Sequence, residues 1–275
     1  MKRFKRKSVI LLIIFIILYP AGYRMRSANS NPLSQINSFR VYYGSINEDI
    51  INQMNELDMV ILESLQLNTD QIKKIREKTK IFGYLSVIEI ANWDRELISK
   101  INEGDYLSLN GQRVAEKDYD NDLGNIDQSH FRQVLLETIE QRIISKGLDG
   151  VFLDTVDWID YYQSLDHETY WRLKLGYEQL LLSIKQKYPR LLVIQNRGFD
   201  TFKDTTHKYV DGLLWENFDI EKYENAKRDD QVKRTAEAKH VTIFLILAKN
   251  TRQNTEFAKK NHWPAIYKEH SYSVW

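Results

Sequence analysis

The sequence contains no cysteine, which excludes a disulfide framework and thiolate chemistry. It also lacks the motifs G-x-G-x-x-G, G-x-x-x-x-G-K-[ST], H-E-x-x-H and G-x-S-x-G, which argues against nucleotide-binding loops, zinc peptidases and serine hydrolases. The formal net charge is only +1, so nothing favours a nucleic-acid partner. The six histidines follow no ligand spacing, and we expect neither a metal nor a cofactor. A Mg²⁺ or Ca²⁺ site built from Glu63, Glu89 and Asp154 stays open, without a specific signal.

The first residues are typical of a secretory signal or a membrane anchor. Residues 1–7 include five basic side chains, and residues 9–19 are wholly apolar. No small-x-small cleavage site follows, and the apolar run is short for a full span, so residues 1–26 are predicted as either signal or anchor. We therefore expect an extracytoplasmic protein, secreted or held at the membrane by this segment. Residues 27–38 are predicted as a linker and residues 39–275 as the folded domain.

From residue 39 onward, strand patterns alternate with helix patterns. Eight short apolar runs are predicted as strands, at residues 39–43, 59–62, 81–87, 151–153, 191–194, 213–215, 241–247 and 265–267. Helical periodicity is clearest over residues 131–146 and 170–188, whereas residues 104–124 form a polar stretch longer than an ordinary loop. This alternation predicts an α/β fold, a (β/α)8 TIM barrel. A doubly wound open sheet is the alternative, but it normally brings a phosphate loop, which this chain lacks.

Acidic and amide side chains follow five of the predicted strands. They are Glu63, Glu89, Asp154, Asn196 and Glu216, after the second to sixth strands in that order. In a barrel these strand ends lie on one rim, where catalysis takes place. Two carboxylates from different strands in an aromatic-lined cleft are the minimum equipment for glycoside hydrolysis. Asp154 is the strongest candidate, although an aspartate in this position can also simply cap the next helix.

Tyrosine and tryptophan, with 16 and 6 copies, supply rings that can stack on sugars, although most such rings fill cores. Several of them lie close in sequence to the predicted strand ends. The residues that we expect to bind substrate are Tyr43, Glu63, Tyr84, Glu89, Trp93, Asp157, Trp158, Asn196 and Trp215. Asp157 is the weakest of the acids, because an aspartate one turn after a strand is often a helix cap.

Four stretches together resemble glycoside hydrolase family 114. They are FGYLSVIEIANW, FRQVLLETIEQRI, KGLDGVFLDTVD and DGLLWENF, and the resemblance covers most of residues 39–267. This family comprises TIM-barrel endo-α-1,4-polygalactosaminidases and the hydrolase-like domain of Pel-polysaccharide proteins. The resemblance implies a catalytic pair of Asp154 and Glu216 and a substrate of α-1,4-linked galactosamine, partly N-acetylated. The chain departs from the family at Ile88, where the family usually has a glycine before the glutamate of its third strand.

The sequence is compatible with two classes of function. The first is an extracytoplasmic glycoside hydrolase that acts on polysaccharide. The second is a non-catalytic, polysaccharide-binding barrel that assists exopolysaccharide synthesis or export, with synthesis proteins as partners. Only the hydrolase requires Asp154 and Glu216 to lie close together. Glu216 adjoins Trp215 and Phe218, an apolar setting suited to a general acid, which leaves Asp154 as the ionised partner.

Overall fold

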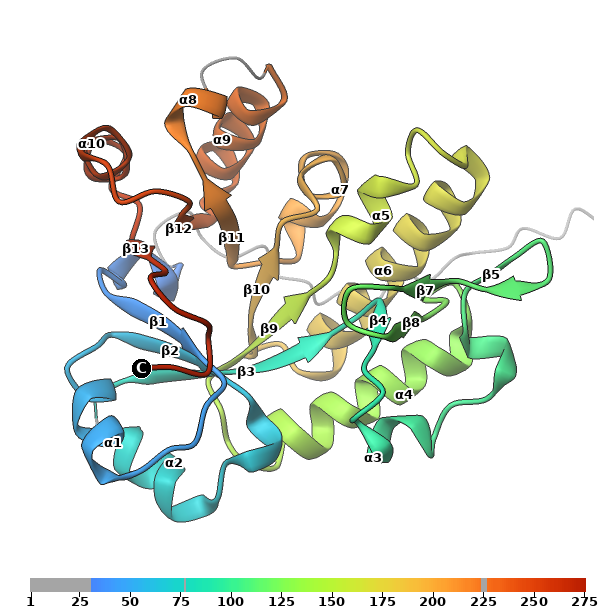
Figure 1. Cartoon of the computed structure of the whole chain (residues 1–275), viewed down its shortest axis with the longest axis horizontal. Helices are drawn as coiled ribbons and strands as arrows, with labels where there is room; N and C mark the ends of the chain where they lie inside the picture. Colours follow the sequence, from blue (N-terminus) through green and yellow to red (C-terminus); the bar gives the residue numbers. More distant parts are fainter. Residues whose placement is uncertain (1–30, 77, 224–226) are drawn as a thin grey trace, which may run out of the picture. The chain divides into compact units, whose positions relative to one another are not determined.

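The computed structural model describes residues 31–76, 78–223 and 227–275 (Figure 1). The predicted signal or anchor, residues 1–26, and the first residues of the predicted linker lie outside these ranges. Within them, no helix combines the length and the apolar character that a membrane span requires.

Eight parallel strands form one sheet in which neighbours in space are neighbours in chain order. They are β1 (Phe39–Tyr42), β2 (Met59–Leu62), β3 (Lys80–Ser86), β9 (Gly150–Asp154), β10 (Leu192–Asn196), β11 (Gly212–Phe218), β12 (Thr242–Leu247) and β13 (Ala265–Tyr267). All eight predicted strands are therefore confirmed. β1 and β13 lie side by side, so the sheet is a nearly closed barrel. A doubly wound sheet would instead reverse its strand order at a switch point.

The helices that follow the strands cover the outside of this barrel (Figure 1). They are α1 (Glu48–Met54), α2 (Thr69–Ile75), α3 (Arg95–Ile98), α4 (Ser129–Ile139), α5 (Asp157–Tyr161), α6 (His167–Lys187), α7 (Phe199–Asp204), α8 (Ile220–Tyr223), α9 (Lys227–Lys239) and α10 (Arg252–Lys260). α4 continues as a π-helix, Glu140–Ile144. The sequence did not predict α5, α7 and α8, because four to six residues are too few to show a helical period.

Strand alternation divides the buried side chains into two cores. The barrel interior contains Phe39, Val41, Met59, Ile61, Phe82, Phe152, Leu192, Ile194, Leu214, Phe244 and Ile246. The side chains between them face outward and pack against the helices. Because both faces of each strand are covered, the strands appear in the sequence as continuous apolar runs.

Residues 31–38, which belong to the predicted linker, pack against the barrel. The 3₁₀-helix Pro32–Gln35 places Leu33 in the interior core with no exposed surface. Asn31 Nδ2 donates hydrogen bonds to the carbonyl oxygens of Asp211 and His240, at 2.8 and 2.7 Å. This segment therefore contributes to the hydrophobic core of the barrel.

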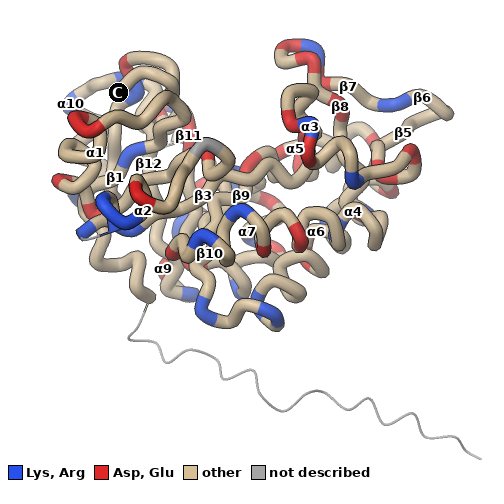
Figure 2. The backbone as a smooth tube through the Cα atoms, turned by 90° about the horizontal axis from the view of Figure 1, so that it is seen from below, with Lys and Arg blue, Asp and Glu red and all other residues tan. Residues whose placement is uncertain are grey.

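The long polar stretch after β3 forms an insert, residues 87–128, built from short antiparallel strands. β4 (Glu89–Ile90), β8 (Asn121–Leu123) and β7 (Ala115–Glu116) form one sheet, and β5 (Ser108–Leu109) pairs with β6 (Gln112–Arg113). In Figures 1 and 2 the insert lies beside the end of β3 and next to α5. The insert thereby brings its own side chains to the rim that the barrel strands form.

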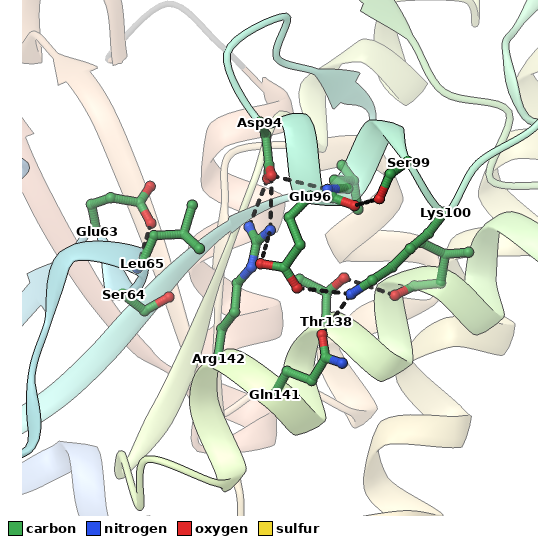
Figure 3. A network of polar contacts seen from close by, with 12 residues as sticks. Glu63, Ser64, Leu65, Asp94, Glu96, Ser99, Lys100, Thr138, Gln141 and Arg142 are labelled. Atoms are coloured by element: carbon green, nitrogen blue, oxygen red, sulfur yellow. Dashed lines mark hydrogen bonds and ion pairs between the residues drawn. The ribbon is translucent and has the colours of Figure 1, made fainter.

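A buried ion pair fastens the insert to the helical layer (Figure 3). Asp94, which caps α3, accepts hydrogen bonds from Arg142 Nη1 at 2.6 Å and Nη2 at 2.8 Å. The two side chains are only 8% and 7% exposed. Burial acts to raise the pKa of Asp94, but the Arg142 hydrogen bonds and charge outweigh it and lower that pKa. Arg142 Nη2 also lies 3.3 Å from Glu96 Oε2 of α3, so two acids of the insert hold this buried guanidinium.

Candidate active site

Six of the predicted site residues point into the barrel mouth because of their positions along the strands. Each lies two residues after a side chain of the interior core, and side chains two apart on a strand point to the same side. The pairs are Val41 and Tyr43, Ile61 and Glu63, Phe82 and Tyr84, Phe152 and Asp154, Ile194 and Asn196, and Leu214 and Glu216. Parallel strands in chain order bring these six residues to one rim.

Asp154 ends β9, and two N–H groups hold its carboxylate. Oδ1 accepts hydrogen bonds from Asn196 Nδ2 at 2.7 Å and from the backbone N of Thr155 at 2.8 Å. Burial raises the pKa of Asp154 to about 6, with a further upward effect from Glu216, while these two hydrogen bonds oppose the shift. Asp154 is therefore mostly ionised at neutral pH, although burial makes its ionisation less favourable than that of an exposed carboxylate.

The backbone turns left-handed directly after three of the site residues. The residues with positive φ are Thr155 after Asp154, Arg197 after Asn196 and Asn217 after Glu216, with φ of 66°, 49° and 54°. This conformation is uncommon for residues other than glycine, and it costs most for β-branched Thr155. Strain of this kind clusters at active sites, and here it follows three candidate site residues on the neighbouring strands β9, β10 and β11.

Thr155 also joins β9 to the insert through its hydroxyl. Oγ1 donates to the carbonyl of Asp154 at 2.6 Å and accepts from the backbone N of Ile88 at 3.0 Å. It lies 2.9 Å from Ser86 Oγ, which in turn accepts from the backbone N of Glu89 at 3.1 Å. These bonds stabilise the strained turn and tie it to the backbone of the insert at Ile88 and Glu89.

A β-bulge in β11 orients Glu216. Trp215 pairs with Leu245 and Phe218 with Leu247, so β11 contains one residue more than β12 between these pairs. The Tyr272 hydroxyl donates a hydrogen bond to Glu216 Oε1. Bulges recur next to active sites because they redirect a side chain without ending the strand.

Trp215 and Phe218 lie on the outer face of β11. Their rings contact each other at 5.5 Å, and the Trp215 ring lies 4.4 Å from that of Phe199. Both residues belong to the core between the sheet and the helices. The apolar setting that the sequence suggested for Glu216 is therefore on the other side of the strand from its carboxylate.

Three tyrosines line the rim between the two carboxylates. The ring of Tyr43 lies 5.0 Å from that of Tyr84 and 5.5 Å from that of Tyr272. Burial raises the pKa of Tyr43 well above its ordinary value, and Asp154 and Glu216 raise it further. The same two carboxylates add to the effect of burial on the pKa of Tyr272. Because Asp154 and Glu216 act on the same hydroxyls, the two acids belong to one cluster.

The remaining acids form a second ring around this cluster. Glu89 in β4 accepts hydrogen bonds from Trp158 Nε1 at 2.7 Å and Asn121 Nδ2 at 3.0 Å. Asp157 forms an ion pair with Arg197 at 3.0 Å, and burial raises its pKa.

Glu63 lies at the end of β2, where its carboxylate accepts a hydrogen bond from the backbone N of Leu65 at 3.0 Å (Figure 3). Burial raises its pKa. With Gly44, Ser45 and Gln71 it lines a small pocket beside β1. In the described ranges, no three histidine, aspartate or glutamate side chains come together as metal ligands, and this holds for Glu63, Glu89 and Asp154 as well.

Trp93 and Trp215 are not brought into the cluster. Trp93 lies on the insert with 60% of its surface exposed, whereas Trp215 is buried in the helical layer. Conversely, the sequence reasoning missed Tyr272 and Asn121. Neither lies at the end of a predicted strand, so no periodic pattern could mark them.

A family model described as hypothetical glycosyl hydrolase family 15 matches residues 90–272, which is more than half of the chain. The chain belongs to this family. The expectation of a glycoside hydrolase is thereby confirmed at the level of the family. No curated protein sequence matches the chain.

Solved structures with the same fold include other glycoside hydrolases. The glycoside hydrolase domain of PelA from Pseudomonas aeruginosa has a TM-score of 0.67 and 17% identity, covering 87% of this chain and 97% of that one. Ega3 of Aspergillus fumigatus, solved with galactosamine, has a TM-score of 0.64 and 15% identity, covering 89% and 95%. Both are members of glycoside hydrolase family 114, so the resemblance noted in the sequence is confirmed. At these identities the structural likeness itself shows the fold.

Proposed function

We propose that this glycoside hydrolase acts outside the cytoplasm and cleaves α-1,4-linked galactosamine polysaccharide, partly N-acetylated, with Asp154 and Glu216 as its catalytic pair. The observation that carries the proposal is the placement of these two carboxylates, from β9 and β11, in one tyrosine-lined cluster. Two carboxylates on neighbouring strand ends of a barrel are what glycoside hydrolysis requires.

Asp154 is the nucleophile in this proposal. Its Oδ1 is held by Asn196 and by the backbone N of Thr155, and N–H donors favour the ionised carboxylate. The hydrogen bonds also fix the direction of attack, because they hold the side chain at the strained end of β9. A pKa of about 6 leaves Asp154 ionised at neutral pH.

Glu216 is the general acid and base. In the first step Asp154 forms a bond to the anomeric carbon, the bond to the leaving sugar oxygen breaks, and Glu216 gives its proton to that oxygen. In the second step Glu216 takes a proton from water, the water oxygen bonds to the anomeric carbon, and Asp154 leaves as a carboxylate. Two displacements return the original configuration, so we propose a retaining enzyme.

The choice of an amine-bearing sugar rests on charge and on likeness. Glu63, Glu89 and Asp157 add negative charge around the catalytic pair, which suits a cationic polymer. Trp158 and the three tyrosines of the cluster offer ring faces to sugars. Ega3, which has the same fold, was solved in complex with galactosamine.

The test is the release of reducing ends from α-1,4-galactosaminan by the full chain, with chitosan, a β-linked amino sugar polymer, as the control substrate. We expect release from the α-linked polymer and none from chitosan. Asp154→Asn and Glu216→Gln should each lower turnover by about 10²–10⁴-fold or more. Binding of the polymer without any release would instead favour a non-catalytic, polysaccharide-binding barrel.

A substrate with a good leaving group separates the two roles. Glu216→Gln should retain activity on an aryl glycoside of galactosamine, because the aryl oxygen needs no proton, whereas Asp154→Asn should stay inactive. The reverse pattern would exchange the roles. NMR of the first product should show the α anomer, and a β product would indicate an inverting enzyme.

The predicted signal or anchor, residues 1–26, suggests that the enzyme meets its substrate at or beyond the membrane, and exopolysaccharide-synthesis proteins are its natural partners there. Fractionation of cells that express the full chain tests the location, and the cytosolic fraction is where the protein should be absent.

A further inference from the structure

The residues after β13 form a strap, residues 268–275, that crosses the barrel mouth and meets the proposed general acid. In Figure 1 this dark red segment returns from β13 toward β1 and α1. The backbone N of Tyr43 donates to the carbonyl of Tyr272 at 2.7 Å, which bridges the gap between β1 and β13. The strap thereby completes the barrel on the side where the sheet is not closed by a strand ladder.

Trp275 anchors the strap to the outer face of β1 and to α1. Its indole Nε1 donates to Gln53 Oε1 at 2.6 Å, and its ring meets that of Tyr42 edge-on at 5.2 Å. The guanidinium of Arg40 lies 4.7 Å from the indole centroid. Gly44 permits this approach, because a Cβ there would lie 2.4 Å from the carbonyl oxygen of Ser273.

Among the residues that the structure describes, Tyr272 connects the strap to the proposed catalytic pair: its hydroxyl donates a hydrogen bond to Glu216 Oε1. Its ring packs against that of Tyr43 and under the ammonium of Lys268, which lies 4.1 Å from the centroid. The described residues give Glu216 Oε2 no hydrogen bond, so that oxygen is left for the substrate. With the Tyr272 phenol on Oε1 and the substrate on Oε2, the carboxyl group could not rotate, and its proton would lie on the oxygen that faces the substrate.

We propose that Tyr272 is a positioning residue for Glu216, delivered by the strap and held there by Trp275. This inference rests on the proposed function, in which Glu216 donates and accepts the proton. A hydroxyl that donates to one carboxyl oxygen holds the group in one orientation, so that its other oxygen is free to exchange a proton with the leaving oxygen. The other titratable or charged groups around Glu216 and Tyr272 are Asp154, Asp157, Tyr43 and Lys268.

The test is kcat and KM of the full chain carrying Tyr272→Phe, which deletes the hydroxyl and keeps the ring. On the polymer we expect kcat to fall by about 10- to 100-fold with little change in KM, since a hydrogen bond to a charged group is lost. On an aryl glycoside of galactosamine kcat should fall much less, because the aryl oxygen needs no proton from Glu216.

The matched control is Tyr267→Phe, which removes the hydroxyl of a 43% exposed tyrosine on β13 and should behave as the wild type. Wild-type kinetics for Tyr272→Phe overturn the inference, as does an equal effect of the two substitutions or an equal loss on the two substrates. If Tyr272→Phe does not fold, Trp275→Ala, which keeps the phenol but frees the strap, must show the same selective loss of kcat on the polymer. Unchanged kinetics in that variant also refute the proposal.

A second readout needs no catalysis and separates this inference from the proposed function. In protein labelled with ¹³C at the glutamate carboxyl groups, Glu216→Gln identifies the Glu216 signal, and Tyr272→Phe should change its chemical shift at fixed pH, because the hydrogen bond to Oε1 is lost. If the wild type releases no sugar but this signal moves, the proposed function is wrong and the contact stands. If hydrolysis occurs and the signal does not move, the role of Tyr272 is refuted and the proposed function stands.

Discussion

Replacing Asp154 by asparagine should make the protein more stable at neutral pH while removing its activity. Burial raises the pKa of Asp154 from 3.8 to about 6, so the folded protein holds this proton more tightly than the unfolded chain does. Ionisation therefore destabilises the fold. The two values differ by about 2 pH units, and at about 1.36 kcal/mol per unit the cost reaches at most about 3 kcal/mol.

The free-energy cost of ionising Asp154 in the folded protein depends on pH. It is absent below about pH 4, where Asp154 is protonated in both states, grows between pH 4 and 6, and is complete above pH 6. Asparagine carries no charge, and its amide oxygen can still accept from Asn196 and from the backbone N of Thr155. Since Asp154 keeps some solvent contact, we expect Asp154→Asn to gain about 1–3 kcal/mol at pH 7.5 and almost nothing at pH 4.

Urea unfolding of both proteins at pH 4, 5, 6 and 7.5 measures this difference, and galactosaminan hydrolysis at pH 7.5 measures the lost activity. The control is Asp118→Asn, at an exposed position of the insert, whose effect on the free energy of unfolding should stay within about 0.5 kcal/mol at every pH. A stability difference for Asp154→Asn that is equal at pH 4 and pH 7.5 would refute the reasoning. So would a less stable variant at pH 7.5.

Four further outcomes are expected. The kcat/KM of the wild type should fall about tenfold per unit below about pH 6, as Asp154 takes up its proton, and a limb near pH 4 would contradict a buried nucleophile. Thr155→Val should lower the free energy of unfolding by about 1–3 kcal/mol in urea titrations, because it orphans a buried N–H and keeps the strained φ, whereas Thr155→Ser should be nearly neutral. Leu33→Ala should lower the free energy of unfolding by about 2–5 kcal/mol, because Leu33 is fully buried in the interior core. A shortened chain that begins at residue 39 should have a melting temperature well below that of one that begins at residue 31. Equal melting temperatures would mean that residues 31–38 are only a linker. Asp94→Ala should lower the free energy of unfolding by about 3–5 kcal/mol, because it removes one partner of a buried ion pair. The double substitution Asp94→Leu with Arg142→Met should lower it less, because it removes both charges. The opposite order would mean that the two buried charges do not stabilise each other.

The sequence by itself determined the barrel and the two carboxylates. A strand buried on both faces must be a continuous apolar run, and eight such runs separated by helices leave few other folds. Asp154 and Glu216 follow two of those runs directly, so position in the chain was enough to place them on one rim. The resemblance to family motifs around Asp154 and Glu216 implied the catalytic pair and the substrate class that we propose.

Only the tertiary structure decided which neighbours each carboxylate has. Trp215 adjoins Glu216 in sequence but lies on the opposite face of β11, because side chains alternate along a strand. Tyr272, 56 residues away in the chain, supplies the hydrogen bond instead. Asp154 likewise depends on Asn196, which the strand order of the barrel brings beside it. Local patterns encode which face of an element is buried, whereas the partner on that face is set by contacts between distant segments, which leave no period in the sequence.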